Sequence, residues 1–292
     1  MSIDAFQEKI RKLKNPSVID LTVYPEDIPA HIMQQEESLS KAYGRFCKEL
    51  IAALAATVPA VRISWTAFSL LGPDGLTELA AVLDAAKDAG LYTILDAPEV
   101  CTYHDAQLAA QTLFGEDSAW HCDALIVNPF IGSDAVKPFL PACKAGDKAL
   151  FVLTRTPNKT AAELQDLLSG SRLVHMALAD IVNRLGETIF GKCGYSRIGA
   201  VAGAPSADSI RSLRAKYKRM FLLVDGLDVP NGNAKNASFA FDQFGRGAAA
   251  VSSRSVTAAW KEAESDGTDY TVHAVAAAER MKKNLSRYLV IL

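Results

Sequence analysis

Charged and polar side chains stand where the short apolar runs of this chain end, and these residues could do chemistry. A charged group at the end of a buried strand resists burial unless it is paired or used. If the strands lie side by side, the groups meet around one cavity that suits a polar, charged ligand. The strand-end residues are Asp20, Arg62, Asp96, Asn128, Thr154, Gly203, Asp225 and Arg254.

The apolar runs themselves predict strands that are buried on both faces, because they are nearly continuous rather than alternating. They cover residues 17–23, 60–64, 92–96, 124–128, 149–154, 198–202, 220–224 and 248–252. The stretches between them have apolar residues at helical spacing. These predict helices over residues 39–56, 75–89, 172–189, 206–218 and 272–289.

Eight strands that alternate with helices predict an α/β fold of the (β/α)₈ TIM-barrel type. A doubly wound open sheet is the alternative, but the first strand is followed by no glycine-rich turn. We expect a single domain over residues 1–292, with an N-terminal helix in 1–16 and a closing helix in 264–292. The long loops 25–37 and 226–239 follow strands and are expected on the C-terminal face of the barrel, where active sites lie.

The bulk composition excludes several classes of protein. The chain has 292 residues, is 49% hydrophobic and carries a net charge of −2, which argues against nucleic acid or an anionic membrane as partner. No apolar stretch is long enough to span a bilayer, and no secretory signal is visible. The five cysteines are scattered, which favours a reduced cytoplasm over a disulfide framework or a metal site.

Arg254 lies directly after the eighth predicted strand, within Ser252-Ser253-Arg254-Ser255. Loops after the last two barrel strands often bind phosphate through backbone N–H groups and an arginine fork. We therefore expect Arg254 to hold a phosphate; a surface arginine that caps a loop is the alternative. Asp20 and Arg62 end neighbouring strands, so they could grip a sugar diol together or form a purely structural ion pair.

Asp96 precedes a loop that is rich in polar groups. Asp105 is placed to begin the next helix at its first turn, and His104 beside it is typical of a surface residue. The thiol of Cys101 has no evident base nearby in the sequence, which favours an inert cysteine.

The segment Leu95-Asp96-Ala97-Pro98-Glu99-Val100-Cys101 resembles the signature of orotidine 5′-monophosphate (OMP) decarboxylases, in which the strand ends Asp-Ala-Lys-Arg-x-Asp. Four more stretches are similar to motifs of the longer bacterial branch, in the same order: residues 123–134, 151–158, 198–204 and 245–255. The resemblance covers about residues 17–260. It implies a homodimeric barrel that converts OMP to UMP in pyrimidine biosynthesis without a cofactor or metal, so the partner would be a small phosphorylated pyrimidine nucleotide.

The resemblance assigns roles position by position. Asp20 matches an aspartate that contacts ribose, and Arg62 stands where the family has a lysine beside the catalytic acid. Asp96 matches the acid next to the substrate carboxylate and is the predicted catalytic residue. Arg254 matches the phosphate-binding arginine. The predicted ligand-binding residues are Asp20, Arg62, Asn128, Ser253 and Arg254.

Several family positions carry other residue types here. Pro98 replaces the lysine that protonates the carbanion at pyrimidine C6, and Cys101 replaces the second aspartate, which reaches the neighbouring subunit's site. Pro157 replaces a serine that contacts the pyrimidine. Pro230 replaces a glutamine that holds phosphate, in a stretch where Asp225 and Asp228 add negative charge that opposes phosphate binding.

Three hypotheses follow. The chain is a working decarboxylase whose acid is displaced to Arg62 or His104, or a catalytically silent paralogue that holds a phosphorylated ligand through Arg254. The third is a different sugar-phosphate or nucleotide enzyme that uses Asp96, Glu99 or His104, since one fold hosts many reactions.

Overall fold

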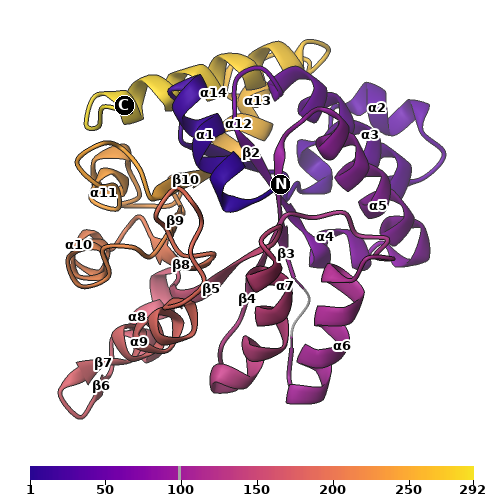
Figure 1. The fold of residues 1–292 in the computed structure, drawn as a ribbon. Helices are drawn as coiled ribbons and strands as arrows, with labels where there is room; N and C mark the ends of the chain where they lie inside the picture. Colours follow the sequence, from indigo (N-terminus) through magenta and orange to yellow (C-terminus); the bar gives the residue numbers. More distant parts are fainter. Residues whose placement is uncertain (98–99) are drawn as a thin grey trace.

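Eight parallel strands close into a barrel in the computed structural model, which describes residues 1–97 and 100–292 (Figure 1). The strands are β1 (Ser17–Asp20), β2 (Ala60–Ser64), β3 (Tyr92–Asp96), β4 (Ala124–Val127), β5 (Ala149–Arg155), β8 (Ile198–Gly203), β9 (Leu222–Asp225) and β10 (Ala248–Ser252). Their order around the barrel is β1-β10-β9-β8-β5-β4-β3-β2. The predicted (β/α)₈ barrel is confirmed, and three of the predicted strands have the observed bounds.

The strands are apolar on both faces because one face fills the barrel and the other supports the helices. Along β3, Ile94 belongs to the cluster that fills the barrel, whereas Leu95 belongs to the cluster between barrel and helices. The same alternation separates Val18 from Ile19 in β1. Successive side chains of a strand point to opposite faces, so the last inward position of several strands falls on a charged residue at the barrel mouth.

Helices surround the barrel (Figure 1). Their bounds are α1 (Ile3–Leu13), α2 (Ala30–Gln35), α3 (Leu39–Leu54), α4 (Trp65–Ser69), α5 (Gly72–Asp88), α6 (Tyr103–Phe114), α7 (Leu140–Ala145), α8 (Ala162–Gln165), α9 (Val174–Gly186), α10 (Ala207–Lys216), α11 (Ala234–Ser238), α12 (Arg254–Thr257), α13 (Ala259–Glu262) and α14 (Tyr270–Ser286). Short 3₁₀ turns occur at η1 (Pro25–Asp27), η2 (Gly132–Ala135), η3 (Lys137–Phe139) and η4 (Lys159–Ala161). In the described part of the chain, no helix combines the length and apolar character needed to cross a membrane.

Three sequence predictions about these connections need correction. The predicted helix at 172–189 begins only at Val174, because β7 (Arg172–Leu173) pairs with β6 (Leu168–Ser169) in a hairpin that turns at Gly170 with a φ of +65°. The loops predicted at 25–37 and 226–239 contain η1, α2 and α11. The closing helix expected over 264–292 is shorter and is α14.

The N-terminal helix α1 covers one end of the barrel. Phe6 is fully buried. Its ring stacks on Tyr92 with the ring centroids 4.4 Å apart and lies 5.6 Å from Phe221. These residues lie at or just before the starts of β3 and β9, so α1 closes the N-terminal end. The mouth at the opposite end carries the strand-end residues.

Candidate functional site at the barrel mouth

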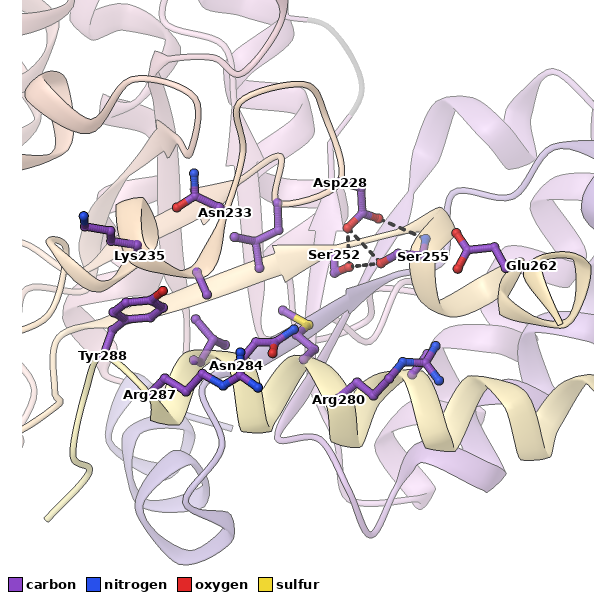
Figure 2. Close-up of a pocket in the computed structure, with 15 residues that line it drawn as sticks. Asp228, Asn233, Lys235, Ser252, Ser255, Glu262, Arg280, Asn284, Arg287 and Tyr288 are labelled. Carbon is purple, nitrogen blue, oxygen red and sulfur yellow. Dashed lines mark hydrogen bonds between the residues drawn. The ribbon is translucent and has the colours of Figure 1, made fainter.

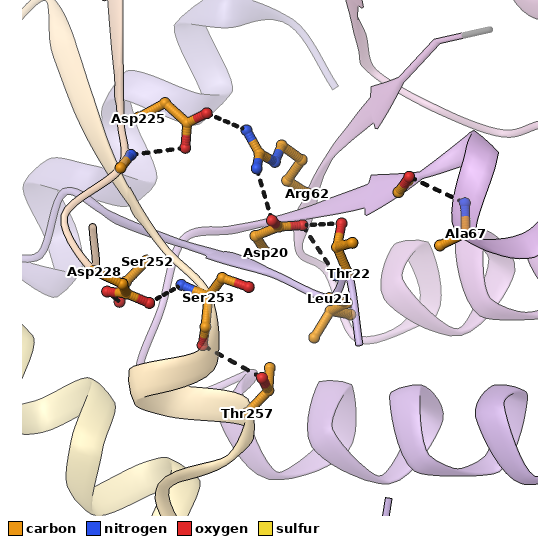
Figure 3. Close-up of polar contacts among 12 residues, drawn as sticks. Asp20, Leu21, Thr22, Arg62, Ala67, Asp225, Asp228, Ser252, Ser253 and Thr257 are labelled. Atoms are coloured by element: carbon orange, nitrogen blue, oxygen red, sulfur yellow. Dashed lines mark hydrogen bonds and ion pairs between the residues drawn. The ribbon is translucent and has the colours of Figure 1, made fainter. Parts of the chain in front are cut away.

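At the mouth, an arginine whose side chain is 12% exposed lies between two carboxylates (Figure 3). Arg62 donates to Asp20 of β1 over 2.6 Å and to Asp225 of β9 over 2.9 Å. It lies in the middle of β2 and not at the strand end as predicted, because β2 continues to Ser64. The ion pair predicted between Asp20 and Arg62 is therefore present, and Asp225 joins it. The side chain of Asp20 is only 4% exposed, so this pairing satisfies charges that could not otherwise be buried.

The surrounding field keeps Arg62 protonated. Burial by itself would lower the pKa of Arg62, but the charges of Asp20 and Asp225 outweigh burial, and Asp96 adds to them, so that the pKa lies well above its usual value. The Nε–H of Arg62 is buried and has no hydrogen-bond partner among the described residues. Arg62 is therefore a fixed cation whose Nε–H is not used by either carboxylate.

Asp96 and Asn128 lie at the same mouth. Both are half-buried. Each lies two residues after an inward-facing isoleucine, Ile94 or Ile126, so each points to the inside of the barrel as well. Asn128 also accepts a hydrogen bond from the backbone N–H of Phe130 over 3.1 Å, so part of its capacity holds the turn after β4. Asp20 and Asp96 thus end β1 and β3, and Asn128 directly follows β4. Arg62 reaches the same opening from the middle of β2.

A carboxylate of the protein itself binds the backbone N–H groups that were expected to hold phosphate. Asp228, in the loop after β9, accepts from the N–H groups of Ser253 at 2.6 Å and Ser255 at 3.2 Å. It also accepts from the hydroxyls of Ser252 at 2.5 Å and Ser255 at 2.9 Å. A carboxylate with four such donors is well satisfied. A ligand phosphate at Ser253 would have to displace it.

Arg254 is also engaged. Its guanidinium donates to Asp27 over 2.7 Å and lies 5.1 Å from the centroid of the Tyr24 ring, while half of the side chain stays exposed. Asp27 is fully buried at the carboxylate and also pairs with Lys261 over 2.9 Å. Burial would raise the pKa of Asp27, but the hydrogen bonds from Arg254 and Lys261 hold it below its usual value. Arg254 thus joins the loop after β1 to α12.

Other predicted residues lie elsewhere or outside the described residues. Thr154 follows Leu153, which packs against the barrel-filling cluster, so strand alternation turns it away from the mouth. It is buried, and its hydroxyl donates to the backbone carbonyl of Val201 at 2.7 Å. Cys101 is exposed and free. Pro98 and Glu99 lie outside the described residues. Asp105 begins α6 as expected, where it forms a capping box with Thr102.

The two prolines near the mouth differ in burial. Pro157 is half-buried, whereas Pro230 is exposed. A Cβ atom at Gly226 would lie 2.4 Å from the Cβ of Pro157, and Gly226 has a φ of +80°. Only glycine tolerates both conditions, so Pro157 packs directly on the loop that carries Asp228.

The sequence reasoning missed Asp27 and the pair formed by Arg155 and Asp166. Arg155 donates to Asp166 in bidentate fashion at 2.9 and 3.0 Å, and this pair anchors the loop after β5. Asp27 lay inside a stretch that was predicted only as a loop. The only sequence feature that marks Asp27 is its acidic type in the loop after the first strand. Acidic residues in loops are too common for this feature to identify an ion-pair partner.

The chemical capacity of the mouth follows from these contacts. It offers a fixed cation and several carboxylates, and a half-exposed arginine at its edge. In the described part of the chain, no group of three or more His, Cys, Asp or Glu residues could hold a metal ion. The arrangement can orient a polar ligand, but each cation at the mouth is already paired with a carboxylate.

Comparisons with known proteins agree along most of the chain. A sequence model of the Orotidine 5'-phosphate decarboxylase / HUMPS family matches residues 103–268, a range that begins after Cys101. The orotidine 5'-phosphate decarboxylase of Rhodopirellula baltica is 33% identical over 237 residues, which cover 79% of this chain and 78% of the relative. That of Clostridium novyi is 28% identical over 286 residues, or 98% of each chain.

Solved structures show the same fold. The chain is similar to Leishmania donovani OMP decarboxylase, with a TM-score of 0.76 at 23% identity over 99% of this chain and 98% of that chain. It is also similar to Plasmodium berghei orotidine 5'-monophosphate decarboxylase, with a TM-score of 0.77 at 14% identity over 98% of both chains.

Proposed function

Because the chain belongs to the orotidine 5'-phosphate decarboxylase family, we propose that its barrel mouth binds a phosphorylated pyrimidine nucleotide without decarboxylating OMP. The observation that carries this proposal is the pairing of Arg62 with both Asp20 and Asp225. The family reaction leaves a carbanion that must receive a proton, and a positioned acid typically contributes a factor of about 10²–10⁴ to such a step. Proline at position 98 has no proton to give.

Arg62 is a poor substitute for the missing acid. Its pKa lies well above the usual arginine value, and proton transfer is efficient when the pKa of the donor lies near the operating pH. Moving the proton off Arg62 would also leave Asp20 and Asp225 without the cation between them, at a cost of several kcal/mol for a buried pair. This argues against the hypothesis of a displaced acid at Arg62.

Ligand binding rests on what the mouth still offers. Arg62 has a buried Nε–H without a partner among the described residues, and half of the Arg254 side chain is exposed. The ribose of a nucleotide would contact Asp20 and Arg62. Its phosphate would contact Arg254 and Ser253. Since Asp228 already takes the N–H of Ser253, we expect modest affinity for the phosphate.

Two measurements on the purified protein test the proposal. Mixed with OMP, the protein is expected to cause no loss of the orotate absorbance, and turnover at ordinary enzyme rates would overturn the claim of silence. With UMP, the melting temperature is expected to rise, because a ligand that binds only the folded state stabilises it. Absence of any shift with OMP, UMP or uridine would overturn the binding claim.

A matched pair of variants locates the phosphate. Arg254→Ala is expected to remove the UMP shift, measured against its own ligand-free melting temperature. Arg211→Ala is the control, because Arg211 also pairs with an aspartate, Asp208, and lies on an aromatic ring, that of Phe239. A UMP shift that survives in Arg254→Ala would contradict the assignment. Sedimentation of the same samples tests the homodimer, which stays a prediction from the family.

A further inference from the structure

A cavity of about 680 Å³ lies beside the barrel mouth, between α14 on one side and α11 with the loop after β9 on the other (Figure 2). Its volume falls within the range of small-molecule sites, about 300–1,000 Å³. Asp228, Ser252 and Ser255 form part of its wall. None of the ion-paired residues Asp20, Arg62 and Arg254 lines it, so it is separate from the ion pairs of the site proposed above.

Helix α14 supplies the floor of this cavity through residues at helical spacing. Ala277, Met281 and Leu285 are buried and form an apolar base. Arg280 and Arg287 lie beside them, two turns apart on one side of the helix. Seven residues correspond to about 10 Å along the helix axis. The two guanidinium groups can therefore reach two separate anionic groups of one ligand.

The cationic groups of the cavity are uncommitted. Arg280 and Arg287 make no ion pair or hydrogen bond through their side chains with a described residue, whereas every other arginine except Arg184 does. Lys235 lines the cavity from α11 (Figure 2) and is also without an ion-pair partner in the described part of the chain.

Two carboxylates offset part of this positive charge. Glu262 and Asp228 are the acidic residues on the wall, against the three cations Arg280, Arg287 and Lys235. The cavity therefore keeps a surplus of one positive charge above an apolar floor. Tyr288 at its rim is 52% exposed and offers an aromatic face.

We propose that this cavity binds an organic polyanion that carries an aromatic ring, of the chemical class of a nucleoside di- or triphosphate. Guanidinium forks match phosphate oxygens in geometry and charge. The ring would lie on the Met281 and Leu285 floor next to Tyr288, and the phosphate chain would run between Arg280, Arg287 and Lys235. This inference does not depend on the function proposed for the mouth.

Titration calorimetry with UTP and ATP, in the absence of divalent metal, tests the proposal. Both nucleotides are expected to bind the wild-type protein. Uridine has the ring without the phosphates and inorganic tripolyphosphate has the phosphates without a ring, so each is expected to bind at least about tenfold more weakly. Raising the salt concentration should weaken binding, because exposed charges are screened. Failure of both triphosphates to bind at millimolar concentration would overturn the proposal.

Two double variants decide the location. Arg280→Gln with Arg287→Gln is expected to weaken binding at least about tenfold. Lys282→Gln with Lys283→Gln removes the same charge from the same helix outside the cavity and is expected to change binding less than about twofold. Arg211→Ala, at an exposed arginine that does not line the cavity, should leave triphosphate binding unchanged. Equal losses in the two double variants, or a loss in Arg211→Ala, would place the triphosphate elsewhere.

Discussion

The carboxylate of Asp228 accepts a hydrogen bond of 2.6 Å from the backbone N–H of Ser253, one residue before the arginine that was expected to hold phosphate. The protein therefore places its own anion where a ligand phosphate would need the same donor. Because like charges repel and the donor is shared, Asp228 and a phosphate cannot both occupy this position. Asp228 thereby sets how strongly the mouth prefers a nucleotide over its nucleoside.

We expect Asp228→Asn to bind UMP at least about tenfold more tightly than the wild type does, which corresponds to about 1.4 kcal/mol. The substitution keeps the shape of the side chain and removes the competing charge. Binding of uridine should hardly change, since uridine has no phosphate. Calorimetry with both ligands measures the effect. Asp208→Asn, at a carboxylate that is 96% exposed on α10, controls for net charge, and an equal gain there would refute the role of Asp228.

Asp20→Asn should lower the free energy of unfolding by about 3 kcal/mol, because it breaks a buried ion pair and leaves the Arg62 charge underpaired. The comparison is Asp134→Asn, which breaks an ion pair with Lys137 in which both side chains are 52% exposed. Exposed pairs contribute at most about 1 kcal/mol. Urea unfolding at neutral pH measures both. Similar values for the two variants would mean that the mouth is hydrated well enough to screen Arg62.

The stability contributed by Asp27 should depend on pH in one direction. The pKa of Asp27 is lowered in the folded protein from the ordinary 3.8, so its contribution is complete above about pH 4 and is lost as the pH falls through the folded-state pKa. We expect Asp27→Asn to be less stable than the wild type by about 1–2 kcal/mol at pH 7. The difference should shrink below pH 3.8. Unfolding curves at several pH values, with Asp117→Asn as an exposed control, test this; a constant difference would contradict it.

Phe6→Ala should destabilise the protein by about 3–5 kcal/mol, the usual loss for a buried aromatic ring. Phe6 is fully buried against Tyr92 and Phe221. Phe130 is 81% exposed, so Phe130→Ala should change stability by less than about 0.5 kcal/mol. Thermal or urea unfolding compares the two. If Phe6→Ala unfolded like Phe130→Ala, α1 would not be sealing the barrel in solution.

The parts of the fold that local sequence decides were predictable. Two-residue alternation places Asp20 on the same side of its strand as Val18, and Asp96 on the same side as Ile94. The charged strand ends therefore had to face the mouth once the barrel was recognised. The same rule excludes Thr154 as a residue of the mouth, because alternation turns its side chain outward. The register of β5 also shifts between Leu153 and Arg155.

What could not be predicted are partners that are distant in sequence. Arg254 pairs with Asp27 across 227 positions, and Arg62 pairs with Asp225 across 163. No periodicity or motif reports such contacts, because they depend on which loops the closed barrel brings together. The β6–β7 hairpin was missed for a different reason: its strands have two residues each and are mostly exposed, so they carry no apolar pattern.

Helix α1 also constrains the order in which the chain can fold as it is synthesised. It emerges before every strand, yet Phe6 needs Tyr92 and Phe221 to cover it, and Lys14 donates to the carbonyl of Ile291 over 2.7 Å. Contacts so far apart in sequence form late, because long loops must close first. An amphipathic helix of this length is marginal in water by itself. We therefore expect α1 to pack onto the barrel late, and its apolar face to stay exposed until β9 has been synthesised.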